Sequence, residues 1–372
     1  MTALASSSSA VSPELASLRE SNSTPRLDLA ANGLLSPLPT AFLAGRDLDL
    51  LAPYRFVVPG KALDLAPAPP AVDRRALAAG LAVANRAYGH PRADELAQKL
   101  ADPRTRVVAT GQQPGLFGGP LLTVAKMIAA SRWAAEIEAR GEPAVAVFWV
   151  ATEDHDWAEV SRSTFLSTAG PSSVDLGPDP EALAPVGTRT FGEGVEAALA
   201  QIGAALPSEF DQRWLAEIAQ WYRPDARFGE AFCRLMARLL GPRCPLMLDA
   251  LLPELKAAER PWLRRLVERR DEVEAHLAAA DSEVVARGFT PQVAPQRGAS
   301  PLFVYRHGGR RRIEWRGSDR FVLRGREEES SVESLLATIE ENPGVVSPGV
   351  LARPAIQDAV LGTSLFLVGP GE

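Results

Sequence analysis

The sequence predicts an α/β protein whose core is a parallel sheet, and three apolar segments carry this prediction. Residues 144–151 form an apolar run without a polar break, as in strands that are covered on both faces. Residues 106–109 form a shorter apolar segment, which a glycine-rich loop and a helical pattern follow. Residues 245–249 form a third segment, which ends in an acidic residue. Strands that alternate with helices in this way are typical of parallel sheets.

The composition indicates a globular protein and argues against one class of partner. A chain of 372 residues, 46% hydrophobic and 23% charged, can bury a large core and has room for two domains or for one domain with insertions. Its formal net charge of -6 disfavours general nucleic-acid binding, which needs a basic surface to neutralise phosphates. We interpret the basic run at residues 310–312, with Arg306, as the solvated edge of a hairpin.

Cysteine usage and hydropathy predict the location of the protein. Cys233 and Cys244 are too few for a secreted disulfide framework, and they indicate a reducing compartment. No apolar run reaches the roughly 18 residues that a membrane-spanning helix requires. The N-terminus is rich in serine and lacks the early basic region of a signal peptide. We therefore expect a cytoplasmic protein that binds neither a membrane nor nucleic acid.

Composition shifts along the chain divide it into a core and insertions. Residues 1–24 are dominated by Ser, Ala and Thr and predict a disordered tail. The core is expected in three pieces, at residues 25–165, 226–260 and 340–372, of which the last holds the final core strand and a terminal turn. The two insertions are a connective segment at residues 166–225 and a charged helix with a small β hairpin at residues 261–339.

Residue spacing predicts the elements in order. Apolar residues at helical spacing predict helices at residues 71–100, 121–140, 195–206, 212–222 and 228–240. Gly89-His90-Pro91 breaks the first of these into two helices, and we interpret His90 as a turn residue. Residues 251–287 predict a long helix with a solvated charged face that includes Glu259 and His276. Strands are predicted at residues 302–305, 312–315, 320–323 and, in the core, 345–351.

A glycine-rich loop between the strand at 106–109 and the helix at 121–140 is the first candidate site. Four glycines in nine residues, Gly111, Gly115, Gly118 and Gly119, leave the backbone uncovered, so that N–H groups can turn toward an anion. Pro120 fits the first helical turn, and a helix N-terminus favours negative charge. Lys126 lies in the second turn, close enough to counter a bound anion. The loop matches neither the Walker motif nor the dinucleotide fingerprint.

An acidic cluster after the strand at 144–151 is the second candidate site. Glu153, Asp154, His155 and Asp156 follow the carboxyl end of that strand, which is where open α/β sheets bind ligands. A carboxylate beside an imidazole can hold an amine, act as a general base or ligate a metal. The alternative is an N-cap and a solvated first turn of the next helix. We expect no metal, because no second His or Cys group lies at ligand spacing.

Acidic and basic residues after other predicted strands are weaker candidates. Asp249 ends the strand at 245–249, where we interpret it as a cap of the next segment. Arg353 and Asp358 flank an apolar stretch, where an unpaired charge would be costly. We therefore expect these two residues to pair with each other or to hold a ligand.

Three motifs, in this order and spacing, resemble the BshC family of cysteine-adding enzymes of bacillithiol biosynthesis. They are TGQQPGLFGGPLLTVAK at residues 110–126, FWVATEDHDWAEV at 148–160 and RPAIQDAVLGTSLFLVGPGE at 353–372. The likeness covers nearly everything after about residue 25. It implies a Rossmann-like core, akin to the nucleotidylyltransferase and class I aminoacyl-tRNA synthetase group, with connective insertions. Family members also carry a coiled-coil arm for dimerisation, which this sequence lacks, so a homodimer is an open expectation.

The resemblance implies a reaction and a set of site residues. The reaction joins the carboxyl group of cysteine to the amine of glucosaminyl-malate, and the cofactor stays open, with ATP or ADP to be tested. Residues 118–121 stand where related folds carry a nucleotide-binding HxGH motif, but here without a histidine. The expected catalytic residues are Glu153, Asp154, His155 and Asp156. The expected substrate-binding residues are Gly111, Gln112, Gln113, Gly115, Gly118, Gly119, Pro120, Leu121, Lys126, Arg353, Gln357, Asp358, Gly369, Gly371 and Glu372.

Two alternatives to this ligase hypothesis remain at the level of sequence. One is a nucleotidylyltransferase-like enzyme that acts on another small molecule, and the other is a non-catalytic binding module that lacks the arm. Every version of the hypothesis makes the same geometric prediction. The glycine-rich loop and the acidic cluster, about forty positions apart, should line one crevice at the rim of the sheet.

Overall fold

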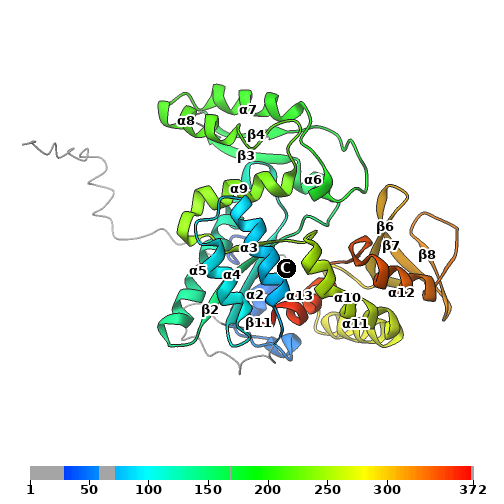
Figure 1. Ribbon diagram of the computed structural model, residues 1–372. Helices are drawn as coiled ribbons and strands as arrows, with labels where there is room; N and C mark the ends of the chain where they lie inside the picture. The colour runs from blue at the N-terminus through cyan, green and yellow to red at the C-terminus, as the bar shows by residue number, and fades with distance from the viewer. Residues whose placement is uncertain (1–28, 58–71, 168, 370–372) are drawn as a thin grey trace, which may run out of the picture.

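The centre of the molecule is a four-stranded parallel sheet (Figure 1). Figure 1 shows the computed structural model of the chain, which describes residues 29–57, 72–167 and 169–369. The strand order is β11–β1–β2–β5, and each neighbouring pair is parallel, which confirms the predicted fold class. These strands are β1 (Arg106–Gln112), β2 (Ala144–Val150), β5 (Leu246–Asp249) and β11 (Thr363–Phe366).

Helices cover both faces of this sheet, because alternate residues of each strand point to opposite sides. In β2, Val147 and Trp149 face one apolar cluster, whereas Phe148 and Val150 face another, and all four are at most 1% exposed. This explains why β2 contains no polar residue. One face packs against α3 (Arg75–Ala87), α4 (Ala93–Ala101), α10 (Pro253–Glu268) and α13 (Arg353–Leu361), and the other against α5 (Leu121–Ala139) and α9 (Phe228–Leu240).

The helix boundaries follow from residues that the sequence marks. Gly89 adopts a left-handed φ of 79° between α3 and α4, and His90 beside it is buried, with Nε2 3.0 Å from the carbonyl oxygen of Cys244. Gly141 ends α5 with a φ of 90°. The N-terminal part of the described chain adds α2 (Pro37–Leu43). Short 3₁₀ helices occur at Leu48–Leu51, Leu116–Gly118, Val186–Thr188, Gly241–Arg243 and Pro343–Val345.

The chain between β2 and α9 forms its own apolar cluster, which lies above the sheet in Figure 1. At its centre the ring of Phe191 packs at a tilt against those of Tyr222 and Phe228, with centroid distances of 5.0 and 4.2 Å. Two of its helices, at Gly194–Ala205 and Glu209–Ile218, overlap those predicted at residues 195–206 and 212–222, and the second begins and ends earlier than predicted. The predicted domain boundaries stay a prediction. The elements are α6 (Trp157–Val160), β3 (Arg162–Ser167), β4 (Gly170–Asp175), α7 (Gly194–Ala205) and α8 (Glu209–Ile218).

A second, antiparallel sheet lies beside the core, with strand order β10–β6–β7–β8–β9 (Figure 1). It contains the predicted hairpin and third strand. It also contains residues 346–348, so their assignment to the core was wrong: they pair antiparallel with β6, and the last core strand is β11. The elements are β6 (Ala299–Arg306), β7 (Gly309–Arg316), β8 (Arg320–Leu323), β9 (Ser330–Ser331), β10 (Val346–Pro348), α11 (Arg270–Ala286) and α12 (Val332–Glu341).

The predicted long helix at residues 251–287 is two helices, α10 and α11, which meet at Arg269. Its charged face is only partly solvated. His276 in α11 is exposed, as predicted, but Glu259 in α10 is fully buried. The placement of Glu259 on a solvated face was therefore wrong, because α10 packs against the core sheet and turns this carboxylate inward.

Candidate functional site

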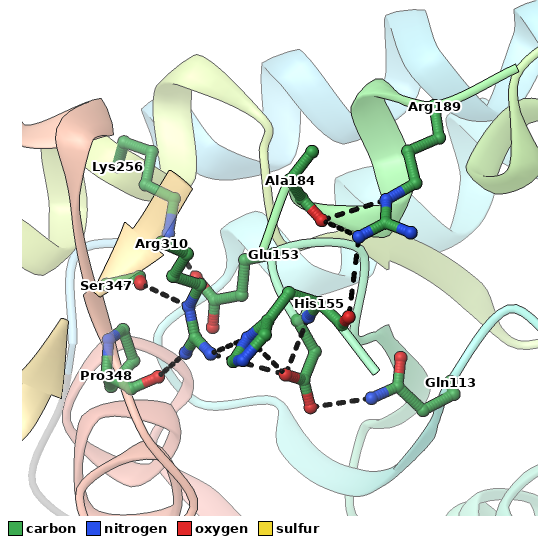
Figure 2. Close-up of polar contacts among 10 residues, drawn as sticks. Gln113, Glu153, His155, Ala184, Arg189, Lys256, Arg310, Ser347 and Pro348 are labelled. Atoms are coloured by element: carbon green, nitrogen blue, oxygen red, sulfur yellow. Dashed lines mark hydrogen bonds and ion pairs between the residues drawn. The ribbon is translucent and has the colours of Figure 1, made fainter. Parts of the chain in front are cut away.

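The glycine-rich loop and the acidic cluster meet at the carboxyl edge of the sheet (Figure 2). Gln113 directly follows β1, and Asp154 follows β2 four residues after the strand ends. Gln113 Nε2 donates to Asp154 Oδ2 at 2.7 Å. The structure thus brings together the two segments that the sequence analysis expected in one crevice, since β1 and β2 are adjacent parallel strands.

Asp154 is held as an anion by its surroundings. Burial alone would raise its pKa, but its contacts with His155 and the charge of Arg310 outweigh burial and lower the pKa to about 2. Its Oδ1 accepts from the backbone N–H of His155 at 2.7 Å and from Arg310 Nη1 at 3.2 Å. The side chain is still 38% exposed, so a fixed negative charge is available to a ligand.

Arg310 completes this arrangement from the second sheet. Its side chain is 6% exposed, and its guanidinium lies 4.0 Å from the ring centroid of Phe303. Its Nε donates to Ser347 Oγ at 2.9 Å and its Nη2 to the carbonyl oxygen of Pro348 at 2.8 Å. Figure 2 shows the guanidinium between these groups and the acidic cluster. The interpretation of residues 310–312 as a solvated edge was therefore wrong for Arg310.

His155 lies between Asp154 and Arg310. Its Nδ1 is 3.2 Å from Arg310 Nη1 and 3.4 Å from Asp154 Oδ1. The backbone carbonyl of His155 accepts from Arg189 Nη2 at 3.4 Å. The side chain of His155 is 29% exposed, so the imidazole borders the solvent side of the site.

A strap from the insertion, residues 183–189, crosses the same edge of the sheet. Val186 N donates to the carbonyl oxygen of Asp154 at 2.6 Å, and Arg310 N donates to that of Leu183 at 2.8 Å. Arg189 fixes the strap from within, because its buried guanidinium donates to Ala184 O at 2.7 Å and pairs with Asp179 at 2.7 Å. The strap therefore hydrogen-bonds to both the acidic cluster and the start of β7.

Glu153 points away from the other members of the acidic cluster. Its carboxylate pairs with Lys256 Nζ at 2.6 Å, and the same amino group pairs with Glu259 at 2.9 Å. All three side chains are at most 5% exposed. Glu153, Lys256 and Glu259, the buried ion triad, connect β2 to α10. In this geometry Glu153 has a structural role, as a partner of Lys256 in the buried ion triad. A role of Glu153 toward a substrate stays a prediction.

The buried ion triad predicts a pH-dependent stability. Burial, with the nearby charge of Glu153, raises the pKa of Glu259 from its ordinary 4.5 to about 7, although Lys256 opposes the rise. Between these two pH values the folded chain keeps a proton that the unfolded chain has lost, so stability should fall as pH rises through this window. Glu259→Gln should flatten that slope in urea unfolding at pH 5 and 7.5. The exposed control Glu341→Gln should keep it; an equal slope in both variants would contradict the assignment.

Asp156 caps a helix, whereas the interpretation of Asp249 as a cap of the next segment was wrong: the N-cap of α10 is Leu252, without a side-chain cap. Asp156 is the N-cap of α6 and accepts from Glu159 N at 3.2 Å, which is the structural alternative that the sequence left open. Asp249 accepts from Leu251 N at 2.8 Å and from the hydroxyl of Thr152. Burial raises the pKa of Asp249, against the effect of these hydrogen bonds.

Two features explain the glycines of the loop: left-handed φ angles at Gly118 and Gly119, and a close approach of the backbone at Gly115. Gly118 and Gly119 have φ values of 96° and 68°, and a Cβ on Gly118 would lie 2.7 Å from Met236 of α9. A Cβ on Gly115 would lie 2.7 Å from Gly119 Cα. The loop therefore folds on itself and against α9. Binding of a ligand to its backbone stays a prediction.

The beginning of α5 differs slightly from expectation. Pro120 has extended backbone dihedrals and occupies the N-cap position, so the first helical turn starts one residue later, at Leu121. The side chain of Leu121 is 81% exposed. Lys126 is buried, and its Nζ donates to Gly111 O at 2.5 Å and to Gln112 Oε1 at 3.1 Å. Lys126 thus secures the end of β1, and its role toward an anion stays a prediction.

Gly111 lies inside β1, opposite Trp149 of β2. A Cβ at this position would come within 2.9 Å of the Trp149 carbonyl oxygen, which belongs to a buried strand that cannot move freely. Gly111→Ala should therefore destabilise the fold by about 1–3 kcal/mol in chemical denaturation. The control Gly203→Ala in α7, whose Cβ would have no neighbour closer than 3.7 Å, should be neutral or stabilising. Equal midpoints for the two variants would refute this explanation.

The C-terminal candidates lie in and after α13. Arg353 Nη1 donates to Gln357 Oε1 at 3.1 Å, and the Arg353 guanidinium lies 5.8 Å from the ring centroid of Phe366 at the end of β11. Asp358 accepts from the Tyr54 hydroxyl at 2.9 Å. Arg353 and Asp358 therefore each have other partners. Gly369 is the last described residue, and Gly371 and Glu372 lie outside the described part of the chain.

Among the described residues, no group of three or more His, Cys, Asp or Glu side chains is placed to hold a metal ion. Within the same part of the chain, no helix has the length and hydropathy to cross a membrane.

A parallel sheet with helices on both faces and polar residues at its carboxyl edge defines a Rossmann-like protein, a class whose members bind ligands at that edge. The chain matches the family described as "Bacillithiol biosynthesis BshC, N-terminal Rossmann-like domain" over residues 62–372. It therefore belongs to the BshC family.

Curated relatives agree with this family. The chain is 34% identical over 287 residues to a protein of Heliobacterium modesticaldum, a match that covers 76% of the chain and 52% of the relative. It is 34% identical over 308 residues to a protein of Salinibacter ruber, with 81% of the chain and 55% of the relative covered. Both bear the name "Putative cysteine ligase BshC". The chain spans about half the length of these relatives.

Proposed function

We propose that the chain provides the catalytic core of a ligase that joins the carboxyl group of cysteine to the amine of glucosaminyl-malate, the last step of bacillithiol biosynthesis. Family membership supports the pathway, and the names of the relatives support cysteine as one substrate. The acceptor amine, that of glucosaminyl-malate, is implied by the resemblance of the motifs at residues 110–126, 148–160 and 353–372 to the family.

The observation that carries this proposal is the placement of Asp154 beside Arg310. Amide formation brings together an amine and a carboxyl group, and a carboxylate in the site can hold and orient the amine. Asp154 offers a permanent, partly exposed carboxylate to an amine. Arg310, whose buried guanidinium lies 3.2 Å from that carboxylate, keeps it ionised, and the partly exposed imidazole of His155 lies beside both groups. Gln113 links this pair to the glycine-rich loop at 2.7 Å.

The direct test is product formation by the chain itself. Purified protein is incubated with cysteine, glucosaminyl-malate and ATP, and bacillithiol is measured by mass spectrometry after thiol labelling. Reactions with ADP, or without nucleotide, show whether a nucleotide is needed. Release of pyrophosphate without cysteine would favour the nucleotidylyltransferase alternative. Binding of glucosaminyl-malate without turnover under every condition would favour the non-catalytic alternative.

Location and assembly belong to the same proposal. We place the protein in the cytoplasm, where cysteine and ATP are available and where Cys233 and Cys244, both buried and free, would stay reduced. A homodimer is the assembly that the family resemblance implies. Light scattering of the purified chain measures it directly.

A further inference from the structure

The contact between Arg310 and His155 determines which ring nitrogen can carry the proton. Arg310 Nη1 lies 3.2 Å from His155 Nδ1, with the geometry of a hydrogen bond. A guanidinium only donates hydrogen bonds, whereas an imidazole nitrogen accepts only when it is unprotonated. In this contact Nδ1 must therefore be the acceptor. The proton of the neutral ring then lies on Nε2.

Asp154 is the one competing partner for Nδ1 among the described residues. Its Oδ1 lies 3.4 Å from Nδ1 and would favour a proton there. That oxygen, however, already accepts from the backbone N–H of His155 at 2.7 Å and from Arg310 Nη1 at 3.2 Å, and a carboxylate oxygen has two lone pairs. The separation from Nδ1 is also longer than the one to Arg310. The carboxylate is thus the weaker competitor.

Arg310 cannot easily turn away from the ring. Its Nε and Nη2 are fixed by Ser347 Oγ at 2.9 Å and by the carbonyl oxygen of Pro348 at 2.8 Å. The guanidinium also lies over the Phe303 ring at 4.0 Å. Within the described part of the chain, Nε2 of His155 has no hydrogen-bond partner, and the side chain is 29% exposed. A donor at Nε2 would therefore be available to a ligand.

We propose that Arg310 holds His155 as the neutral Nε2–H tautomer, which makes His155 a hydrogen-bond donor to a substrate carboxyl or carbonyl oxygen and not a base. Arg310 is then a positioning residue, since it acts through the ring. The donor role rests on the proposed ligase function, whereas the tautomer does not. A neutral imidazole that donates to a substrate oxygen stabilises negative charge as it develops on that oxygen.

The tautomer is measured by ¹⁵N NMR of the full chain labelled at histidine. The chain has only four histidines, and the signal that disappears in His155→Gln assigns His155. At neutral pH we expect a pyrrole-type Nε2 and a pyridine-type Nδ1 in the unmodified protein. A protonated Nδ1 would overturn the proposal. In Arg310→Met, Asp154 is the remaining neighbour of Nδ1, so the proton should move toward Nδ1; an unchanged tautomer would remove Arg310 as its cause.

The donor role is measured by comparing two replacements of His155. The amide of Gln places an N–H near the position of Nε2, whereas the amide of Asn places it near Nδ1. We expect His155→Asn to lose about 10²-fold in kcat, as for the loss of one oxyanion donor, and His155→Gln to keep at least ten times more activity than His155→Asn. Equal losses in both would overturn the donor role. If the unmodified chain makes no product, the donor role falls with the ligase function, and the NMR result still decides the tautomer.

Discussion

Asp154→Asn should lower kcat/KM for bacillithiol formation by about 100-fold while the fold is retained. The variant keeps the shape of the side chain but removes the charge that Arg310 and Gln113 hold in place at 3.2 and 2.7 Å. A charged hydrogen bond contributes up to about 3 kcal/mol, and each 1.36 kcal/mol of lost transition-state stabilisation is a factor of ten. The measurement is the initial rate of product formation over a range of amine concentrations.

A matched substitution separates this effect from a general loss of charge. Asp94→Asn removes a carboxylate from α4 that is 69% exposed and, among the described residues, pairs with Arg86, so the rate should stay within a factor of two. Circular dichroism and urea unfolding of both variants show whether they are folded. Full activity of a folded Asp154→Asn would mean that Asp154 does not take part in the reaction.

Lys256→Met should destabilise the chain by about 3–5 kcal/mol. The substitution leaves Glu153 and Glu259, both at most 5% exposed, without the cation that lies 2.6 and 2.9 Å from them. Removing one partner of a buried ion pair is costly, because the remaining charge stays uncompensated. The measurement is the free energy of unfolding in urea at pH 8, where both carboxylates are ionised in the unfolded chain.

Two comparisons test this explanation. Lys99→Met removes surface ion pairs with Glu95 and Glu138 and should cost less than about 1 kcal/mol. In the triple variant, Lys256→Met with Glu153→Gln and Glu259→Gln, the uncompensated charges are gone, so much of the lost stability should return. A triple variant no more stable than Lys256→Met would show that packing, and not charge, accounts for the loss.

The sequence was sufficient for three of the four core strands and for one half of the site. The unbroken apolar run of β2 predicts a covered parallel strand, and neighbouring parallel strands end at the same edge of a sheet. This is why Gln113 and Asp154 could be expected near each other. Sequence alone can locate a residue at the edge of the sheet when that residue directly follows a predicted strand.

The other half of the site could not be predicted, because it depends on contacts between distant segments. Arg310 reaches Asp154 across 156 positions, and the two residues that follow it, Arg311 and Arg312, are also arginines, so the pattern indicates a solvated strand. In the sequence, Lys256 and Glu259 resemble an ion pair on the surface of a helix. Their burial becomes evident only from the packing of α10 against the core. The strand at residues 346–348 was expected from its residues, but its sheet was not, since an apolar segment does not specify its partner.

The parallel pairing of β11 with β1 constrains how the protein is made. Leu367 accepts a hydrogen bond from the hydroxyl of Thr110, 257 positions earlier, so β11 emerges from the ribosome long after β1 has been synthesised. Until then β1 can be only an edge strand of the nascent chain, with one row of backbone N–H and C=O groups unpaired, and such edges favour aggregation. Protection of this edge during synthesis is therefore a requirement that the topology itself imposes.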